Sequence, residues 1–160
     1  MNFRQVTLVG LLQCIVCNKM KRISLPSIAE ISLKTKGTLF DTLDMDILEV
    51  EDCRIEFSMF VNSKHLAPNH YLHGGAVVSL ADSACGVGAL SHLPIGALGF
   101  TTIELKTNFL GTITTGELRC IATPHHLGRT TQVWDAEVTE YESDKTIAIF
   151  RCTQMVLWPK

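Results

Sequence analysis

The feature of this sequence that most limits its fold is one long apolar segment in a chain that otherwise has strand-like patterns. The segment runs from Ala76 to Leu90, lacks proline, is long for a strand, and ends before Pro94. It therefore predicts a single buried helix. The segments after it alternate rather than repeat every 3.6 residues, so we expect no further long helix there.

Strand patterns lie on both sides of this helix. Before it, residues 46–61 form two strand segments with a turn at 51–52, followed by a loop over 62–72. After it, turn signals separate four more strand segments; in the first of these, Thr102 and Glu104 alternate with Ile103 and Leu105. The segments are residues 101–110, 117–123, 131–141 and 146–158.

This order predicts an α+β fold in which an antiparallel sheet of five to six strands packs around one long helix. We expect residues 37–160 to form one domain. Residues 1–36 read as an N-terminal segment that is partly helical or loosely ordered.

Composition excludes several classes of protein. A chain with 46% hydrophobic and 19% charged residues can form a core, and a net charge of −2 does not suit a nucleic-acid binder. No helix-turn-helix pattern supports a DNA-binding regulator. The apolar stretch Val6–Cys17 is too short to span a membrane.

The six cysteines fit a reducing, cytoplasmic location better than a disulfide framework, because a chain of this size needs no disulfides to fold. Several lie in apolar patterns, where cysteine acts as a small hydrophobic residue. Cys14 and Cys17 have half the spacing of a zinc site but lack a second pair, so we predict no metal.

Asp82 is the most informative residue. It is the only Asp, Glu, Lys or Arg between Lys64 and Glu104, and it falls in the middle of the apolar helix. A carboxylate there must reach water, find a partner, or have its pKa raised by desolvation. Helical spacing puts Ser79, Asp82, Ser83 and Gly86 on one stripe. The stripe could face solvent or a site.

The tripeptide His73-Gly74-Gly75 opens the same helix. Unpaired N–H groups and the helix dipole favour negative charge there, and glycine lets a ligand approach the backbone. Alone, the tripeptide fits an ordinary turn as well. Together with a buried carboxylate it supplies an oxyanion site and a base or nucleophile, which acyl transfer needs.

Spacing limits how these groups could cooperate. Gly74 and Asp82 are eight residues apart, which is about 12 Å along a helix. One carbonyl group cannot contact both in the same chain. If both act on one substrate, Asp82 must come from a neighbouring subunit, with two equivalent sites across a two-fold axis.

Several ordered motifs resemble the PaaI-like hotdog-fold acyl-CoA thioesterases. They are Leu72-His73-Gly74-Gly75, Ala81-Asp82, residues 102–110 (TIELKTNFL) and His126-Leu127-Gly128-Arg129, and the similarity spans about residues 40 to 158. The family has a long helix wrapped by an antiparallel sheet, which agrees with the order of elements above.

The resemblance implies a role for each matching residue. The Gly74 N–H would polarise the thioester carbonyl, His73 would shape the loop, Asp82 would be the base or nucleophile, and Thr102 would hold the hydrolytic water. The family has Asn or Gln where this chain has Ala67; Asn69, two residues out of register, is the candidate substitute.

The resemblance also implies a site for coenzyme A, made by Gly75 and by the loop residues Gly128, Arg129 and Thr130 near the CoA phosphates. For Arg129 a solvated turn is the alternative.

The function that we expect is an acyl-CoA thioesterase that yields free acid and CoA without metal or cofactor. Its acyl group stays open. The resemblance implies a homodimer, and further a homotetramer made of two dimers. The alternative is a hotdog module that binds acyl-CoA without turnover, because Ala67 replaces the usual amide. A hydratase is less well supported, since no buried Asp and His pair is found.

Overall fold

The computed structural model describes residues 22–160. The predictions for the apolar stretch Val6–Cys17 lie outside these residues. The elements are, in order, α2 (Ile28–Thr35), α3 (Leu39–Thr42), β1 (Met45–Glu51), β2 (Arg54–Val61), η1 (Ser63–His65), α4 (Gly74–Ser91), β3 (Gly99–Phe109), β4 (Gly116–Leu127), β5 (Thr131–Glu140) and β6 (Thr146–Leu157).

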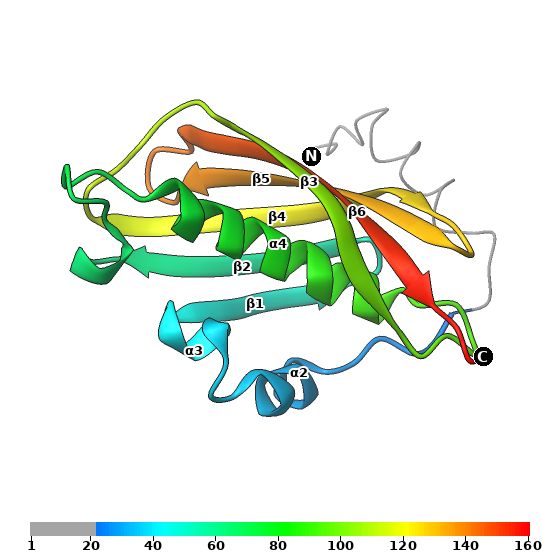
Figure 1. The fold of residues 1–160 in the computed structure, drawn as a ribbon. Coiled ribbons are helices and arrows are strands. Elements are labelled where there is room, and N and C mark those ends of the chain that lie inside the picture. The colour runs from blue at the N-terminus through cyan, green and yellow to red at the C-terminus, as the bar shows by residue number, and fades with distance from the viewer. Residues whose placement is uncertain (1–21) are drawn as a thin grey trace, which may run out of the picture.

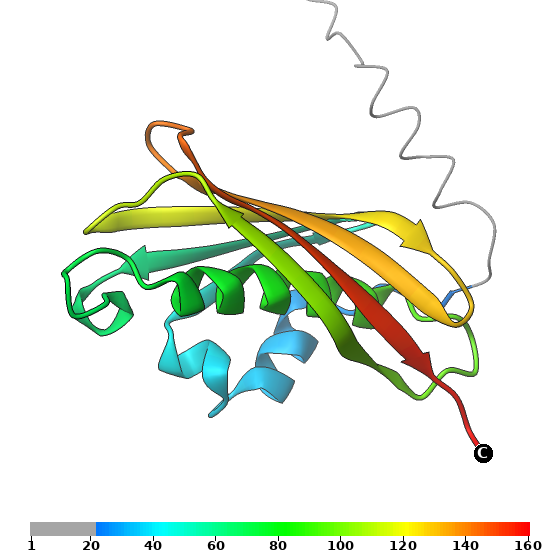
Figure 2. The ribbon, with the colours of Figure 1, turned by 45° about the horizontal axis from the view of Figure 1, so that its top comes forward.

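Six strands form one sheet in the order β1-β2-β4-β5-β6-β3, and every neighbouring pair is antiparallel. Helix α4 lies along one face of this sheet, and α2 and α3 lie on the same side next to β1 (Figures 1 and 2). The predicted α+β class, the buried helix and the strand segments are confirmed. Strand β3 is left at the edge opposite β1.

The core lies between α4 and the inner face of the sheet. Leu80, Ala84, Phe57 and Trp134 are all fully buried there. At Gly88 a Cβ atom would lie 2.6 Å from the Trp134 ring, so glycine is needed for this approach. Among the described helices, α4 alone has the length and apolar composition of a membrane span. However, 56% of it is buried inside the protein, which is typical of a core helix.

The C-terminal end of α4 is held by a buried polar network. The side-chain amide of Gln132 donates to the His92 carbonyl at 3.0 Å, and its oxygen accepts the Trp134 indole N–H at 2.9 Å. The His92 ring in turn bonds the Gly88 carbonyl at 2.8 Å. Polar groups buried in this way are satisfied, so the helix end is fixed against β5.

The predicted alternation of inward-facing and outward-facing residues in β3 is wrong at the start of the strand. The pairing of β3 with β6 shifts register between Thr102 and Glu104, so Thr102 pairs with Gln154 and Glu104 pairs with Thr153. Ile103 is the extra residue of this bulge. Thr102 therefore faces α4, whereas simple alternation places it on the outer face with Glu104.

Candidate active site on helix α4 and strand β3

Asp82 and Thr102 form the chemical centre of the candidate site. Asp82 is half-buried on α4, and its Oδ1 atom lies 3.3 Å from the Thr102 hydroxyl on β3. The same hydroxyl lies 2.9 Å from Oε1 of Gln154, a fully buried residue on β6. The sequence predicted Asp82 and Thr102 separately, and the fold brings them together.

Burial raises the pKa of Asp82 above the usual value for an aspartate, and the hydrogen bond from Thr102 partly opposes this. The desolvated carboxylate is thus a better proton acceptor than an exposed one. Such a shift is typical of functional carboxylates.

The helix N-terminus supplies the second part of the site. His73 is the N-cap, and its Nδ1 accepts the Gly75 N–H at 2.8 Å, while the Ala76 N–H bonds the His73 carbonyl at 2.9 Å. Within residues 22–160 the Gly74 N–H has no acceptor. It is the donor left for a ligand at this helix end.

Phe109 of β3 lies against Gly74. A Cβ atom at Gly74 would be 2.9 Å from Cζ of the Phe109 ring, so the glycine is needed for this close approach. Since Thr102 lies beside Asp82 and Phe109 beside Gly74, β3 and α4 run antiparallel along the whole site.

The loop before α4 is anchored by a buried histidine. The His65 ring accepts the Asn62 N–H at Nδ1 and bonds the Leu43 carbonyl through Nε2 at 3.0 Å. Its own carbonyl accepts the His73 N–H at 2.9 Å, which fixes the N-cap. Asn69 is exposed, and its Oδ1 accepts the Tyr71 N–H at 3.3 Å. No contact within residues 22–160 joins Asn69 to Asp82.

Gln132 and Thr102 both pair with Gln154, so they lie in one row of the sheet, and the loop Gly128-Arg129-Thr130 ends two residues before Gln132. A Cβ atom at Gly128 would lie 2.8 Å from the Thr131 carbonyl oxygen. The Arg129 guanidinium lies 4.9 Å from the centre of the Trp158 ring. Arg129 is exposed but held by this cation–π contact.

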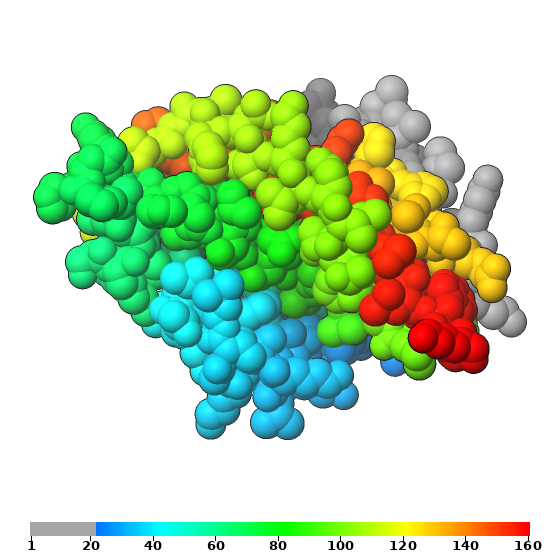
Figure 3. Space-filling model, in the orientation of Figure 1, coloured from blue at the N-terminus to red at the C-terminus, as the bar shows by residue number. Residues whose placement is uncertain are grey.

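The predicted residues therefore form three separate groups within one chain: Asp82 with Thr102, the start of α4, and the loop Gly128-Arg129-Thr130. Gly74 and Asp82 are on the same helix, as the spacing argument required, about 12 Å apart. Figure 3 shows part of the α4 surface uncovered between α3 and β3. The four residues of the stripe on α4 are each half-buried, so the stripe is neither sealed in the core nor fully exposed: Ser79, Asp82, Ser83 and Gly86.

A hollow of about 600 Å³ lies on the outer face of the sheet, away from α4. Its walls mix both charges, with Lys106 and Arg151 beside Asp135 and Glu137. Arg151 already pairs with Asp135. No predicted site residue lines it.

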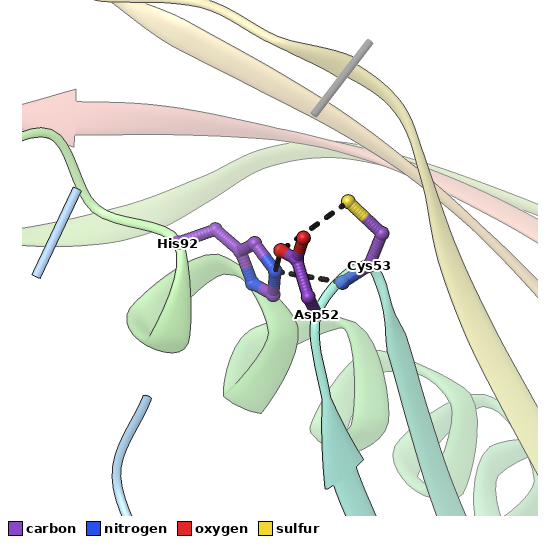
Figure 4. Close-up of side chains that lie close together, drawn as sticks. All are labelled: Asp52, Cys53 and His92. Carbon is purple, nitrogen blue, oxygen red and sulfur yellow. Dashed lines mark hydrogen bonds and ion pairs between the residues drawn. The ribbon is translucent and has the colours of Figure 1, made fainter. Parts of the chain in front are cut away.

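Asp52, Cys53 and His92 have metal-binding atoms within 4.8 Å of one another (Figure 4). The Cys53 backbone N–H donates to His92 Nε2 at 2.9 Å, and Nδ1 bonds the Gly88 carbonyl. Both ring nitrogens are thus already engaged, and a metal needs a free lone pair on one of them. Cys53 is also disulfide-bonded, so its Sγ is not free to bind a metal; the expectation from the sequence that the cysteines stay reduced is wrong for this residue. The cluster is therefore a structural contact at the end of α4 rather than a metal centre.

The sequence reasoning missed His65, Phe109 and Gln154 as parts of this region. His65 and Phe109 carry no local signal of their contacts. Gln154 had a possible signal, because it is a polar residue between Cys152 and Val156 in an alternating strand whose neighbours at that spacing are buried.

Comparison with known proteins supports the fold and identifies the family. The family model of the thioesterase superfamily matches residues 69–147, which contain every predicted site residue. The 1,4-dihydroxy-2-naphthoyl-CoA hydrolase of Listeria monocytogenes is 33% identical over 115 residues, covering 72% of this chain and 92% of that protein.

Solved structures agree as well. A mutant of thioesterase PA1618 from Pseudomonas aeruginosa superposes with a TM-score of 0.79 at 29% identity, covering 85% of this chain and 97% of that one. The PaaI protein of E. coli, from the phenylacetic acid degradation operon, superposes with a TM-score of 0.72 at 25% identity, covering 81% and 91%.

Proposed function

This chain belongs to the thioesterase superfamily and has the hotdog fold, and on that premise we propose that it hydrolyses acyl-CoA thioesters with Asp82 of one subunit and the Gly74 N–H of another. The observation that carries the proposal is the desolvated Asp82 carboxylate beside the Thr102 hydroxyl, on the helix whose first N–H has no acceptor among residues 22–160.

The Gly74 N–H serves as the oxyanion donor. A thioester carbonyl placed at the start of α4 accepts this N–H, and the helix dipole favours the charge that develops on its oxygen. His73 keeps the Gly75 N–H engaged and so directs the Gly74 N–H alone at the substrate.

Asp82 activates the attack. As a general base it takes a proton from water while the water oxygen bonds the carbonyl carbon; the tetrahedral intermediate then expels the CoA thiolate, which receives a proton. As a nucleophile, its oxygen bonds the carbonyl carbon directly, CoA leaves, and water cleaves the resulting anhydride. In both cases Thr102 orients Asp82 or the water.

The edge strand β3 would allow two subunits to complete the site. Ile103, Leu105 and Phe109 are exposed on it, and an uncovered apolar edge favours pairing with a second strand. A two-fold axis between residues 105 and 106 would pair Thr102 with Phe109 of the partner subunit. Because Thr102 contacts Asp82 and Phe109 contacts Gly74, each Asp82 would then approach Gly74 of the partner subunit.

Coenzyme A would extend from this site toward the loop Gly128-Arg129-Thr130, where the Arg129 guanidinium suits a phosphate. Gly75 would lie along the same ligand at the helix start. We expect no metal or cofactor to take part. Two dimers would associate into a homotetramer, and a cytoplasmic location fits the use of CoA.

The substrate class is an acyl or aryl thioester. Phe109 offers an apolar surface next to Gly74, which suits the acyl group better than the nucleotide. One relative is named for hydrolysis of an aryl-CoA, 1,4-dihydroxy-2-naphthoyl-CoA. An aryl thioester is thus the first class to test.

A second candidate function is binding of acyl-CoA without turnover. Ala67 favours it, because its methyl group cannot donate to the thioester carbonyl, and Asn69 Oδ1 is already engaged by the Tyr71 N–H. This candidate predicts CoA binding that does not depend on Asp82.

Release of free CoA from aryl, short-chain and long-chain acyl-CoAs tests the proposal, with chromatographic detection because the cysteines react with thiol reagents. We expect turnover by the wild type and a loss of about 10²–10⁴-fold in Asp82→Ala, with CoA binding retained. Binding by both proteins without turnover on any thioester would favour the second candidate. Asp46→Ala, on the exposed face of β1, is the matched control.

A further inference from the structure

We infer that Gln154 is a positioning residue for Asp82, whose buried amide aligns the Thr102 hydroxyl so that its proton points at the Asp82 carboxylate. The inference rests on the proposed role of Asp82. It concerns three side chains from three elements: Asp82 on α4, Thr102 on β3 and Gln154 on β6.

The location of Gln154 is unusual for its residue type. It is fully buried, yet long amide side chains are mostly exposed. It pairs with Thr102 on one side and with Gln132 on the other, so one row of the sheet carries three polar residues across β5, β6 and β3. Such a row in a core costs free energy unless each group is bonded.

The two glutamines have different tasks. The Gln132 amide is engaged by the His92 carbonyl and the Trp134 indole, at the end of α4. The Gln154 amide has Thr102 at 2.9 Å and the Cys152 Sγ at 3.2 Å. Gln154 is thus the buried amide that bears on the candidate site.

Counting protons gives the direction of the bonds. The Thr102 hydroxyl has one proton, so it cannot donate both to Oε1 of Gln154 and to Asp82. In the structure Oε1 faces Thr102, an arrangement that suits a protonated Asp82 donating to Thr102. A half-turn of the amide presents its NH₂ group instead, and Thr102 then donates to the ionised carboxylate, while Oε1 accepts the weak Cys152 S–H.

The second arrangement is the stronger one. A hydrogen bond to a carboxylate is roughly twice as strong as a neutral one, and a hydroxyl that accepts an N–H donates better. Gln154 therefore favours the ionised, reactive form of Asp82. It opposes the burial that raises the pKa of this carboxyl.

The other titratable groups near Asp82 are thiols. Cys85 lies one turn further along α4 and interacts electrostatically with Asp82, and Cys152 contacts Gln154. Burial raises the pKa of the Cys85 thiol, so this thiol does not interfere with a titration at acid pH. No charged side chain within residues 22–160 contributes to the pKa shift of Asp82.

The test is a titration of the Asp82 side-chain carboxyl by carbon NMR in the full chain, assigned by comparison with Asp82→Asn. We expect the pKa to rise by about one pH unit in Thr102→Val and by about half as much in Gln154→Met. In the Thr102→Val background, Gln154→Met should add nothing, because Gln154 acts through the hydroxyl. If Gln154→Met does not fold, Gln154→Asn takes its place, because asparagine keeps the amide on a shorter side chain.

Gln132→Met is the matched control. It removes a buried glutamine from the same row of the sheet, so it should lower the thermal stability and leave the Asp82 titration unchanged. An unchanged or lowered pKa in Gln154→Met would overturn the inference, and so would a shift that persists in the Thr102→Val background.

The acid limb of kcat/KM should move with the NMR titration. If the wild type hydrolyses no thioester while the titration shifts as expected, the proposed function fails and the positioning role of Gln154 stands. If hydrolysis depends on Asp82 while the titration does not respond to Gln154, the positioning role fails alone.

Discussion

At the scale of single residues, the site combines groups that lower the stability of the fold. A half-buried carboxylate on an apolar helix and an N–H without an acceptor both cost free energy, and both are useful only to a ligand. The sequence could identify Asp82 as the lone charge of its segment. It could not place Thr102 beside Asp82, because the bulge at Ile103 reverses the face on which Thr102 lies. The partners of Gln154 likewise depend on strand register.

Asp82→Asn should separate stability from activity. The raised pKa means that the folded chain keeps a proton that the unfolded chain releases above about pH 4, so the wild type loses stability as pH rises through the folded pKa. Asparagine removes this loss. The stability advantage of Asp82→Asn over the wild type should therefore grow with pH, as measured by urea unfolding, while CoA release falls about 10²–10⁴-fold. Hydrolysis within tenfold of the wild type would contradict the role of Asp82.

At the scale of elements, both ends of α4 are fixed by buried histidines. His65 holds the loop before the helix, and His92 ends it. The helix and the strands could be predicted from apolar periodicity, since each is long and bounded by turn residues. The anchors could not, because His65 and Leu43, or His92 and Cys53, are distant in sequence and meet only in the fold.

Burial lowers the pKa of both His65 and His92. Below about pH 6.5 the unfolded chain takes up protons that the folded chain does not, so the free energy of unfolding should fall as pH decreases from 7 to about 5.5. Urea unfolding at several pH values measures this dependence. His92→Gln should make the free energy of unfolding depend less on pH. His70→Asn should leave this dependence unchanged; His70 is exposed and has a positive φ, which asparagine tolerates. Equal slopes in the wild type and His92→Gln would contradict the account of His92.

At the scale of the whole molecule, one chain holds both halves of the proposed site but keeps them apart. Helix α4 separates Gly74 from Asp82, and the uncovered edge of β3 offers a way to bring the Asp82 of one subunit to the Gly74 of the next. The eight-residue spacing between Gly74 and Asp82 predicts a shared site if both groups act on one substrate. The sequence could not predict which strand edge is proposed to pair with a second subunit. That proposal depends on β3 lying outermost in the sheet beside β6, although β4 and β5 separate β3 from β6 in the sequence.

The most direct test of the shared site is to mix two inactive variants. Gly74→Ala blocks the approach to the oxyanion donor beside Phe109, and Asp82→Asn removes the carboxylate. A mixed dimer contains one site with both groups intact and one with neither, and random mixing makes half of the dimers mixed, so CoA release should recover to about a quarter of the wild-type rate. Mixed dimers detected by native mass spectrometry that release CoA no faster than the two parent variants would contradict a site shared between subunits.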